Sequence, residues 1–259
     1  MLDYTNIKSY WNNRAKEEGA TLQSTTNDYY LREIEINTLS HYISELINES
    51  QKELLVGDIG CGDGYVTSSL ASNFTEAKFF GYDYSSEMVK NANTRKSLNC
   101  IFDIADIIHD KLDQKFDVLY TTRCLINLPD VELQKKALMT IHESLGENGF
   151  YFMIENFIDG HANFNEVREN FGLEPIPVRN HNLFFSHNWL DDYIKDKFDI
   201  IKIENISSMY YLVSRIIYSK ICQENGVLPD YFDIHHSLAS KLPFNGNFGP
   251  VKLLLLKKK

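Results

Sequence analysis

Glycines and an acidic residue that could hold a ligand follow a short apolar run in the first quarter of the chain. Asp58 lies near the end of the run, and Gly60, Gly62 and Gly64 follow at every second position. Because glycine has no Cβ, it can adopt positive φ and allows a ligand to approach the backbone closely. Residues 65–74 have the apolar spacing of a helix, whose first amides can face a polar group. The sequence therefore predicts a strand, a ligand-binding loop and a helix.

The spacing of these glycines separates two kinds of nucleoside-binding loop. The dinucleotide fingerprint G-x-G-x-x-G requires a glycine at position 65, where this chain has Tyr65. The pattern Asp58-x-Gly60-x-Gly62-x-Gly64 instead resembles motif I of the class I methyltransferases that depend on S-adenosylmethionine (SAM). The resemblance implies an α/β fold with a Rossmann-like sheet of about seven strands and helices on both faces. It also implies SAM as the methyl donor and S-adenosylhomocysteine (SAH) as a product.

Acidic residues after the next strands are candidates to bind the nucleoside. Asp83 ends a second expected strand, 77–83, about 20 residues beyond Gly64, where a carboxylate can accept both ribose hydroxyls. By resemblance, Asp103 accepts the adenine amino group and the backbone amide of Ile104 reaches a ring nitrogen. The remaining cofactor contacts predicted are Tyr84, Met88, Thr121, Tyr10 and Arg14.

The N-terminal segment has two interpretations. Apolar and aromatic residues recur there at steps of three or four, which places an aromatic stripe on one face of a short helix; they are Tyr4, Ile7, Tyr10, Trp11 and Ala15. The stripe could pack in the core. In the family that the chain resembles, a segment of this kind often folds over the cofactor as a lid. Both interpretations remain open at this point.

Polar and aromatic residues beyond the fifth strand could bind the methyl acceptor. The candidates for catalysis are Glu155, at the end of that strand, and Arg168 and His181, whose chemistry suits anion binding and proton transfer. These polar residues could instead be solvated, in a helix over 161–171 and a connecting loop. We expect a single methyltransferase domain, 1–259, with a helical cap (1–50), a SAM-binding core (51–156), acceptor-side helices with an insert (157–248), and a last strand with a tail (249–259).

Composition argues against several other functions. The formal net charge is −10, and the only basic run, Lys257 to Lys259, is expected to be a solvated tail, so nucleic acid is not an expected partner. The cysteines lack paired spacing and suggest a reducing compartment. His235 and His236 would diverge on a helix, so no metal is expected. With no signal peptide or membrane span expected, the prediction is a cytoplasmic monomer or homodimer.

These features together predict a SAM-dependent methyltransferase that methylates an oxygen of a small molecule. The run Thr121–Asp130, with Glu155 and Phe171–Ile176, resembles methyltransferases from bacterial surface-polysaccharide clusters. Some of those are associated with the O-methyl phosphoramidate decoration of capsules, which implies a phosphoramidate, nucleotide-linked or sugar-linked acceptor. Two alternatives remain: a noncatalytic SAM-binding sensor, and an NAD-dependent oxidoreductase, which the glycine spacing disfavours.

Overall fold

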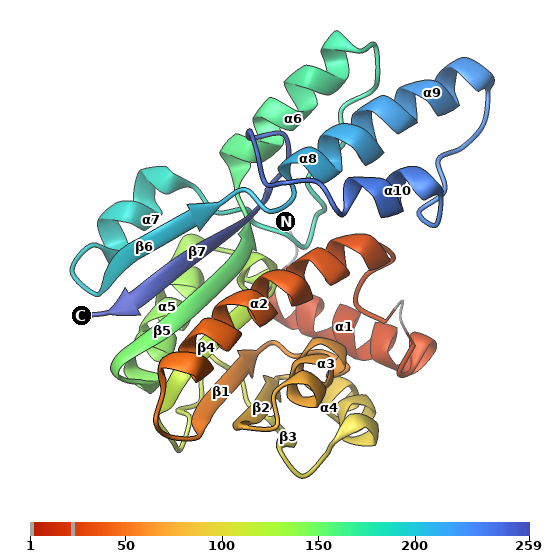
Figure 1. The fold of residues 1–259 in the computed structure, drawn as a ribbon. Coiled ribbons are helices and arrows are strands. Elements are labelled where there is room, and N and C mark those ends of the chain that lie inside the picture. The colour runs from red at the N-terminus through yellow and green to blue at the C-terminus, as the bar shows by residue number, and fades with distance from the viewer. Residues whose placement is uncertain (1–2, 22–23) are drawn as a thin grey trace.

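A seven-stranded sheet forms the centre of the computed structural model, which describes residues 3–21 and 24–259 (Figure 1). The strand order is β3-β2-β1-β4-β5-β7-β6. The first five strands of this order run parallel, and β7 is antiparallel to both β5 and β6. The predicted Rossmann-like sheet is thus confirmed. The strands are β1 (Leu54–Ile59), β2 (Ala77–Asp83), β3 (Cys100–Ile104), β4 (Phe116–Thr122), β5 (Leu145–Asn156), β6 (Phe198–Glu204) and β7 (Val251–Lys258).

Helices cover both faces of the sheet, as the parallel strand connections require. None of the helices in the described ranges combines the length and apolarity needed to cross a membrane. They are α1 (Tyr4–Glu18), α2 (Tyr29–Glu49), α3 (Tyr65–Asn73), α4 (Ser86–Ala92), α5 (Val131–Ser144), α6 (Ile158–Asn170), α7 (His187–Ile194), α8 (Ser208–Tyr211), α9 (Tyr218–Asn225) and α10 (Ile234–Ala239).

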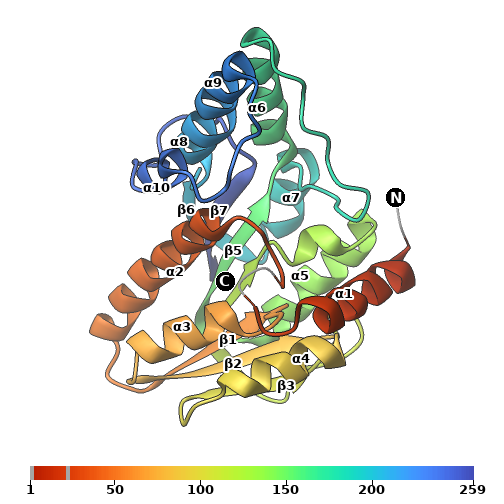
Figure 2. The same ribbon diagram turned by 90° about the vertical axis from the view of Figure 1, so that its right-hand side faces the viewer.

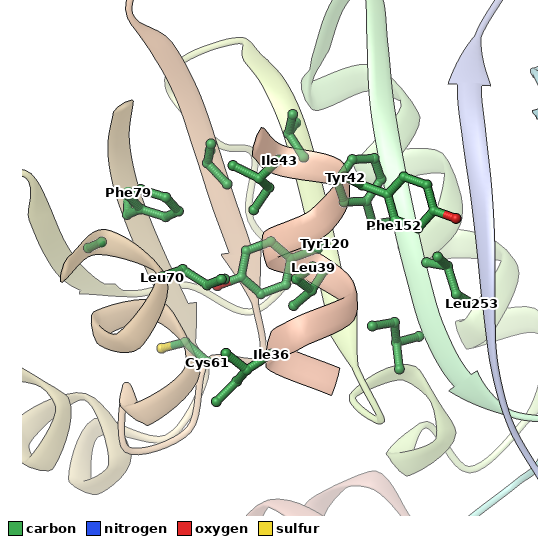
Figure 3. Close-up of a cluster of buried hydrophobic side chains, with 14 of the residues drawn as sticks. Ile36, Leu39, Tyr42, Ile43, Cys61, Leu70, Phe79, Tyr120, Phe152 and Leu253 are labelled. Atoms are coloured by element: carbon green, nitrogen blue, oxygen red, sulfur yellow. The ribbon is translucent and has the colours of Figure 1, made fainter. Parts of the chain in front are cut away.

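Two hydrophobic clusters hold the helices in place. On one face, Leu39 and Ile43 of α2 pack with Tyr120 of β4 and Phe152 of β5 (Figure 3). On the other face, α5 and α7 pack on alternate residues of the same strands, among them Leu119. Successive side chains of a strand point to opposite faces of the sheet, so neighbouring residues of β4 and β5 enter different clusters. Both faces of the sheet are therefore buried.

One segment differs from the sequence-based expectation. The prediction that Lys257 to Lys259 form a solvated tail is wrong for most of the run, because β7 continues to Lys258 and the Nζ of Lys258 donates a hydrogen bond to the carbonyl of Leu145.

The chain beyond β5 builds an outer layer at the carboxyl edge of the parallel strands. Helix α6 follows directly from β5 and lies beside α8 and α9, and α10 lies on the other side of those two helices (Figures 1 and 2). Phe164, Leu173 and Ile216 form a small separate cluster between these helices. The insert between β6 and β7 therefore contributes walls to the space above the sheet edge.

The glycine loop after β1 lies directly against the segment after β4. Gly60 has a φ of 76°, and a Cβ at this position would lie 2.2 Å from the Sγ of Cys124. The backbone amide of Gly60 donates to the carbonyl of Tyr82 in β2 at 2.7 Å. Glycine is thus required here both by the backbone conformation and by the close approach of a neighbouring segment.

We expect Gly60→Ala to lower the free energy of unfolding by about 2–5 kcal/mol, from left-handed strain plus overpacking. Gly226 is a matched control, because its φ is 66° and no atom lies within 4 Å of a built Cβ. Gly226→Ala should therefore lower the free energy of unfolding only through the strain of a left-handed backbone. Denaturant unfolding of both variants measures these losses of stability. A double-mutant cycle of Gly60→Ala with Cys124→Gly then isolates the part that comes from the contact with Cys124. Equal losses at the two glycines, or additive losses in the cycle, would contradict this packing.

Candidate functional site

A cavity of about 140 Å³ lies over the glycine loop, where β1, β2 and β4 end. We call it the glycine-loop cavity. Five residues predicted to bind the cofactor line it, namely Gly60, Gly62, Asp83, Tyr84 and Met88. Lining residues from other segments include Arg32 and Glu35 of α2, Thr122 at the end of β4, Arg123, Cys124 and Asn127 after β4, and His181 and Asn182 of the loop before α7.

Asp83 is placed to accept hydroxyl groups from a ligand. Its carboxylate accepts hydrogen bonds from the backbone amides of Gly62 at 3.0 Å and Ser85 at 2.8 Å. Burial raises the pKa of Asp83 to about 6. A carboxylate has about four lone-pair sites, so two remain for further donors such as ribose hydroxyls. The arrangement fits the nucleoside part of SAM.

Other predicted cofactor residues lie beside the cavity without lining it. Asp58 is buried under the loop and accepts a hydrogen bond from the hydroxyl of Thr67 at 2.6 Å. Thr121 is buried and bonded to the hydroxyl of Tyr151, while its neighbour Thr122 faces the cavity. These two residues therefore support the loops that surround the cavity. Asp103 and Ile104 are exposed at the end of β3, and the amide of Ile104 donates to the carboxylate of Asp103.

Helix α1 covers the site and so adopts the lid position. The side chain of Asn12 accepts a hydrogen bond from Ser85 at the start of α4, and Trp11 donates to the side chain of Asn127 at 3.3 Å. Trp11 lines the glycine-loop cavity, and Tyr10 stacks on His181 with ring centroids 4.7 Å apart. The structure places the predicted cofactor residues Tyr10 and Arg14 in the wall of a second cavity instead.

The second cavity, of about 320 Å³, adjoins the first. We call it the arginine chamber, because it is lined by Arg14, Arg123, Arg179 and Arg215. Its aromatic walls come from α6, the following loop and the insert, and comprise Phe164, Phe184, Tyr211 and Tyr231. The two cavities share part of their lining, which identifies the junction between them: Trp11, Thr25, Arg123, Ile126, Arg179 and Asn182.

Of the three residues predicted to be catalytic, only His181 lines either cavity. Arg168 donates to the backbone carbonyls of Glu174 and Arg215, so its guanidinium holds the outer layer together. Burial, with the nearby charges of Arg179 and Arg14, lowers the pKa of His181 and keeps its imidazole neutral near pH 7. Neutral imidazole can accept a proton.

Glu155 has a positioning role in the structure. It is fully buried, and its carboxylate accepts hydrogen bonds from the backbone amides of Cys124 at 3.1 Å, Leu125 at 2.9 Å and Ile126 at 3.3 Å. Burial raises the pKa of Glu155 to about 7. Because these acceptor sites face the backbone, the carboxylate fixes the segment that forms the cavity wall and does not itself face the cavity.

Two arginines of the site make contacts that the sequence did not predict. Arg123 pairs with Glu35 through Nε at 2.6 Å and Nη2 at 3.1 Å, across 88 residues of sequence. Arg32 of α2 is only 2 % exposed; its Nη2 donates to Thr25, and its Nη1 has no hydrogen-bond partner among the described residues. Such a guanidinium suits the carboxylate of the methionine part of SAM. In the sequence, the only indication of these contacts was that Arg32 and Glu35 lie on a largely apolar helix.

The pH dependence of stability should reveal the buried acid beneath the loop. Burial raises the pKa of Asp58 from 3.8 to about 7, so between these pH values the folded protein keeps a proton that the unfolded chain releases. The free energy of unfolding therefore falls as pH rises through this window. In Asp58→Asn this loss is absent, so the stability of the variant relative to wild type should grow between about pH 5 and pH 7, by at most about 1.4 kcal/mol per pH unit.

Chemical denaturation at several pH values measures this difference. The exposed Asp196→Asn is the matched control, because it removes one acid from the surface. A stability difference between Asp58→Asn and wild type that stays constant with pH would contradict a proton held at Asp58.

Comparison with known proteins shows the family. A methyltransferase domain model matches residues 50–199. The malonyl-[acyl-carrier protein] O-methyltransferase of Bacillus cereus is 28% identical over 139 residues, 51% of each chain. The trans-aconitate 2-methyltransferase of Deinococcus radiodurans is 39% identical over 75 residues, 29% of this chain and 28% of that protein. The matched region thus spans about half the length, or less, of these curated relatives.

The fold has solved counterparts. The magnesium protoporphyrin IX methyltransferase of Synechocystis, solved with bound SAH, superposes with a TM-score of 0.63 at 16% identity, covering 99% of this chain and 100% of that one. The same protein has been solved with SAM. The glycine loop, the family match and the superposition together lead to one conclusion: this chain belongs to the methyltransferase domain family and has the class I fold, which the solved counterpart shares with SAM or SAH bound.

Proposed function

We propose that this methyltransferase transfers the methyl group of SAM to an oxygen of a small molecule held in the arginine chamber. The observation that carries the proposal is the shared wall of the two cavities, which brings an acceptor in one cavity next to a donor in the other. A relative whose name specifies O-methyl transfer supports the choice of oxygen. We also propose that the cap, core, acceptor-side and last-strand segments act as one domain, since each contributes to or supports these walls.

The residues around the glycine-loop cavity would align the donor and exclude water. SAM supplies a methyl group on a positively charged sulfonium, ready for in-line displacement. Asp83 would accept the ribose hydroxyls, Met88 would pack on the adenine, and Arg32 would pair with the carboxylate. Helix α1 covers the site through Trp11. Alignment of this kind accounts for roughly 7–11 kcal/mol of barrier in well-oriented reactions.

The need for a base depends on the acceptor. A hydroxyl acceptor loses a proton as its oxygen is methylated, and neutral His181 is the candidate to receive it. An ionised oxygen needs no base. Glu155 would act only by positioning residues 124–126, because its carboxylate is bonded to their amides.

For the acceptor itself, we propose a phosphoramidate or a nucleotide- or sugar-linked intermediate of capsule biosynthesis, following the sequence resemblance described above. Arg179 and Arg123 at the junction would contact its oxygens. Arg168, an earlier candidate for this contact, is instead bonded to backbone carbonyls.

A noncatalytic SAM sensor is the second candidate function. It would share the glycine-loop cavity but would have side chains filling the space beyond the methyl group. The arginine chamber occupies that space, which favours an enzyme.

Asp83→Ala should weaken SAM binding by about 10- to 100-fold, because it removes a charged acceptor of the ribose hydroxyls. Titration calorimetry with the purified full chain measures the dissociation constant. Glu143→Ala, an exposed acid on α5, is the control and should leave it unchanged. Unchanged affinity in Asp83→Ala would contradict the ribose contact.

Methyl transfer from labelled SAM, followed by product mass, tests the activity. The acceptor panel should contain nucleotide-linked phosphoramidates, nucleotide sugars and small carboxylic acids. A labelled product heavier than its acceptor by one methylene is expected from at least one class. Tight SAM binding without product from any class would favour the sensor over the enzyme.

A further inference from the structure

Positive charge is concentrated in the arginine chamber of an otherwise acidic protein. The formal net charge of the chain is −10, yet four arginines line this chamber, and Asp28 is the only carboxylate among its described lining residues. A concave site lined mainly by one sign of charge concentrates ions of the opposite sign. The chamber is therefore suited to an anionic ligand.

Three of the four arginines are already engaged by the protein. Arg215 pairs with Asp28 at 2.5 Å, Arg123 pairs with Glu35, and Arg14 donates to the carbonyl of Ser24 at 2.7 Å. These contacts satisfy part of the donor capacity of each guanidinium and hold it in place. They leave the fourth arginine as the main candidate for a ligand contact.

Arg179 differs from these three. Within residues 3–21 and 24–259, its guanidinium has no hydrogen-bond or ion-pair partner, whereas every other arginine has at least one. The planar guanidinium matches carboxylate and phosphate groups with two parallel N–H···O bonds. Arg179 therefore carries an unused recognition group for an oxyanion.

The position of Arg179 determines where an oxyanion bound to it would lie relative to the donor. Arg179 and Asn182 line both cavities and so lie at the junction where acceptor and donor meet. The side chain of Asn182 donates to that of Asn127 at 3.2 Å, which also accepts from Trp11 of the lid helix. This bond ties the loop that carries Arg179 to the wall after β4. A group bound by Arg179 would consequently lie beside the methyl group.

We infer that the acceptor is an oxyanion, either a carboxylate or a phosphate-type group, and that one of its own oxygens receives the methyl group while Arg179 holds the other. This inference rests on the proposed function and narrows its substrate class. A lone pair of the oxygen forms the new O–C bond, and the S–C bond breaks with its electron pair remaining on sulfur. The negative charge of the acceptor and the positive charge of the sulfonium disappear together, and no proton is released.

With an oxyanion acceptor no base is required, and the reaction itself gives a route to product release. His181 need not accept a proton, because the attacking oxygen is already ionised. The methyl ester has one negative charge fewer than the acceptor, so it binds Arg179 less strongly than the acceptor did.

Binding to the SAH-loaded full chain tests the inference directly. The probes are phenylacetate and benzyl phosphate, with 2-phenylethanol and benzyl alcohol as neutral counterparts, because the chamber has aromatic walls. Calorimetry should show that the anions bind at least about tenfold more tightly than their neutral counterparts. Arg179→Gln should remove that preference, Arg179→Lys should restore part of it, and SAM affinity should stay within about threefold of wild type in both.

Lys136→Gln is the matched control, because it removes one positive charge from the exposed face of α5, outside both cavities. It should leave the preference for anions unchanged. Equal binding of charged and neutral probes, insensitivity to Arg179→Gln, or failure of both anions to bind would overturn the inference. Methyl transfer to a neutral hydroxyl would then leave the proposed function standing. A stronger response to phenylacetate or to benzyl phosphate distinguishes the two oxyanion types.

Proton release during turnover provides a second, independent readout. For the acceptor that the activity panel identifies, transfer to an ionised oxygen releases no proton, whereas transfer to a hydroxyl releases one for each methyl group. Turnover in weakly buffered solution with a pH indicator measures this ratio. A ratio near zero is expected, and a ratio near one would overturn the inference while confirming methyl transfer.

Discussion

The hydrogen bonds between Glu155 and three consecutive backbone amides organise the rest of the site. A buried carboxylate at the end of β5 fixes Cys124, Leu125 and Ile126 in the segment after β4. The residue just before them, Arg123, has a φ of 53°, and its side chain turns towards Glu35 of α2. Such bonds compensate a buried charge that would otherwise be costly. These hydrogen bonds thus hold the wall between the two cavities in place.

The same segment connects the N-terminal helix α1 with the loop before α7. Asn127 accepts hydrogen bonds from Trp11 and from Asn182, which come from opposite ends of the sequence. The side-chain oxygen of Asn127 thereby joins two walls of the site. The junction of the cavities therefore depends on one residue that bridges the lid, the core and the acceptor side.

Buried ion pairs set the charge of the arginine chamber. Asp28 caps α2, accepts from the hydroxyl of Tyr210 and pairs with Arg215 of the insert. Glu35 of α2 likewise forms an ion pair with Arg123. Pairs of this kind add little net stability, because desolvation offsets the Coulomb attraction, but they fix the geometry of the groups they join. The chamber thereby combines held arginines with one, Arg179, that has no protein partner among the described residues.

Sequence reasoning recovered the parts of the site that are local. The glycine loop and Asp83 were predicted because backbone conformation and strand ends leave a signal within a few residues. The roles of Glu155 and Arg168 were not predicted, because each contacts backbone groups brought near by the fold. Glu155 reaches amides about 30 residues away in sequence, and Arg168 reaches the carbonyl of Arg215, 47 residues away. Spacing alone contains no information about such contacts.

The most direct test is a crystal structure of the full chain with bound SAH. The ribose should contact Asp83, the homocysteine carboxylate should lie near Arg32, and the sulfur should face the junction beside Arg179 and Asn182. That result would establish that donor and acceptor meet where the two cavities join. A homocysteine carboxylate bound to Arg179, with the sulfur facing away from the arginine chamber, would contradict both the placement of the donor and the assignment of the chamber to the acceptor.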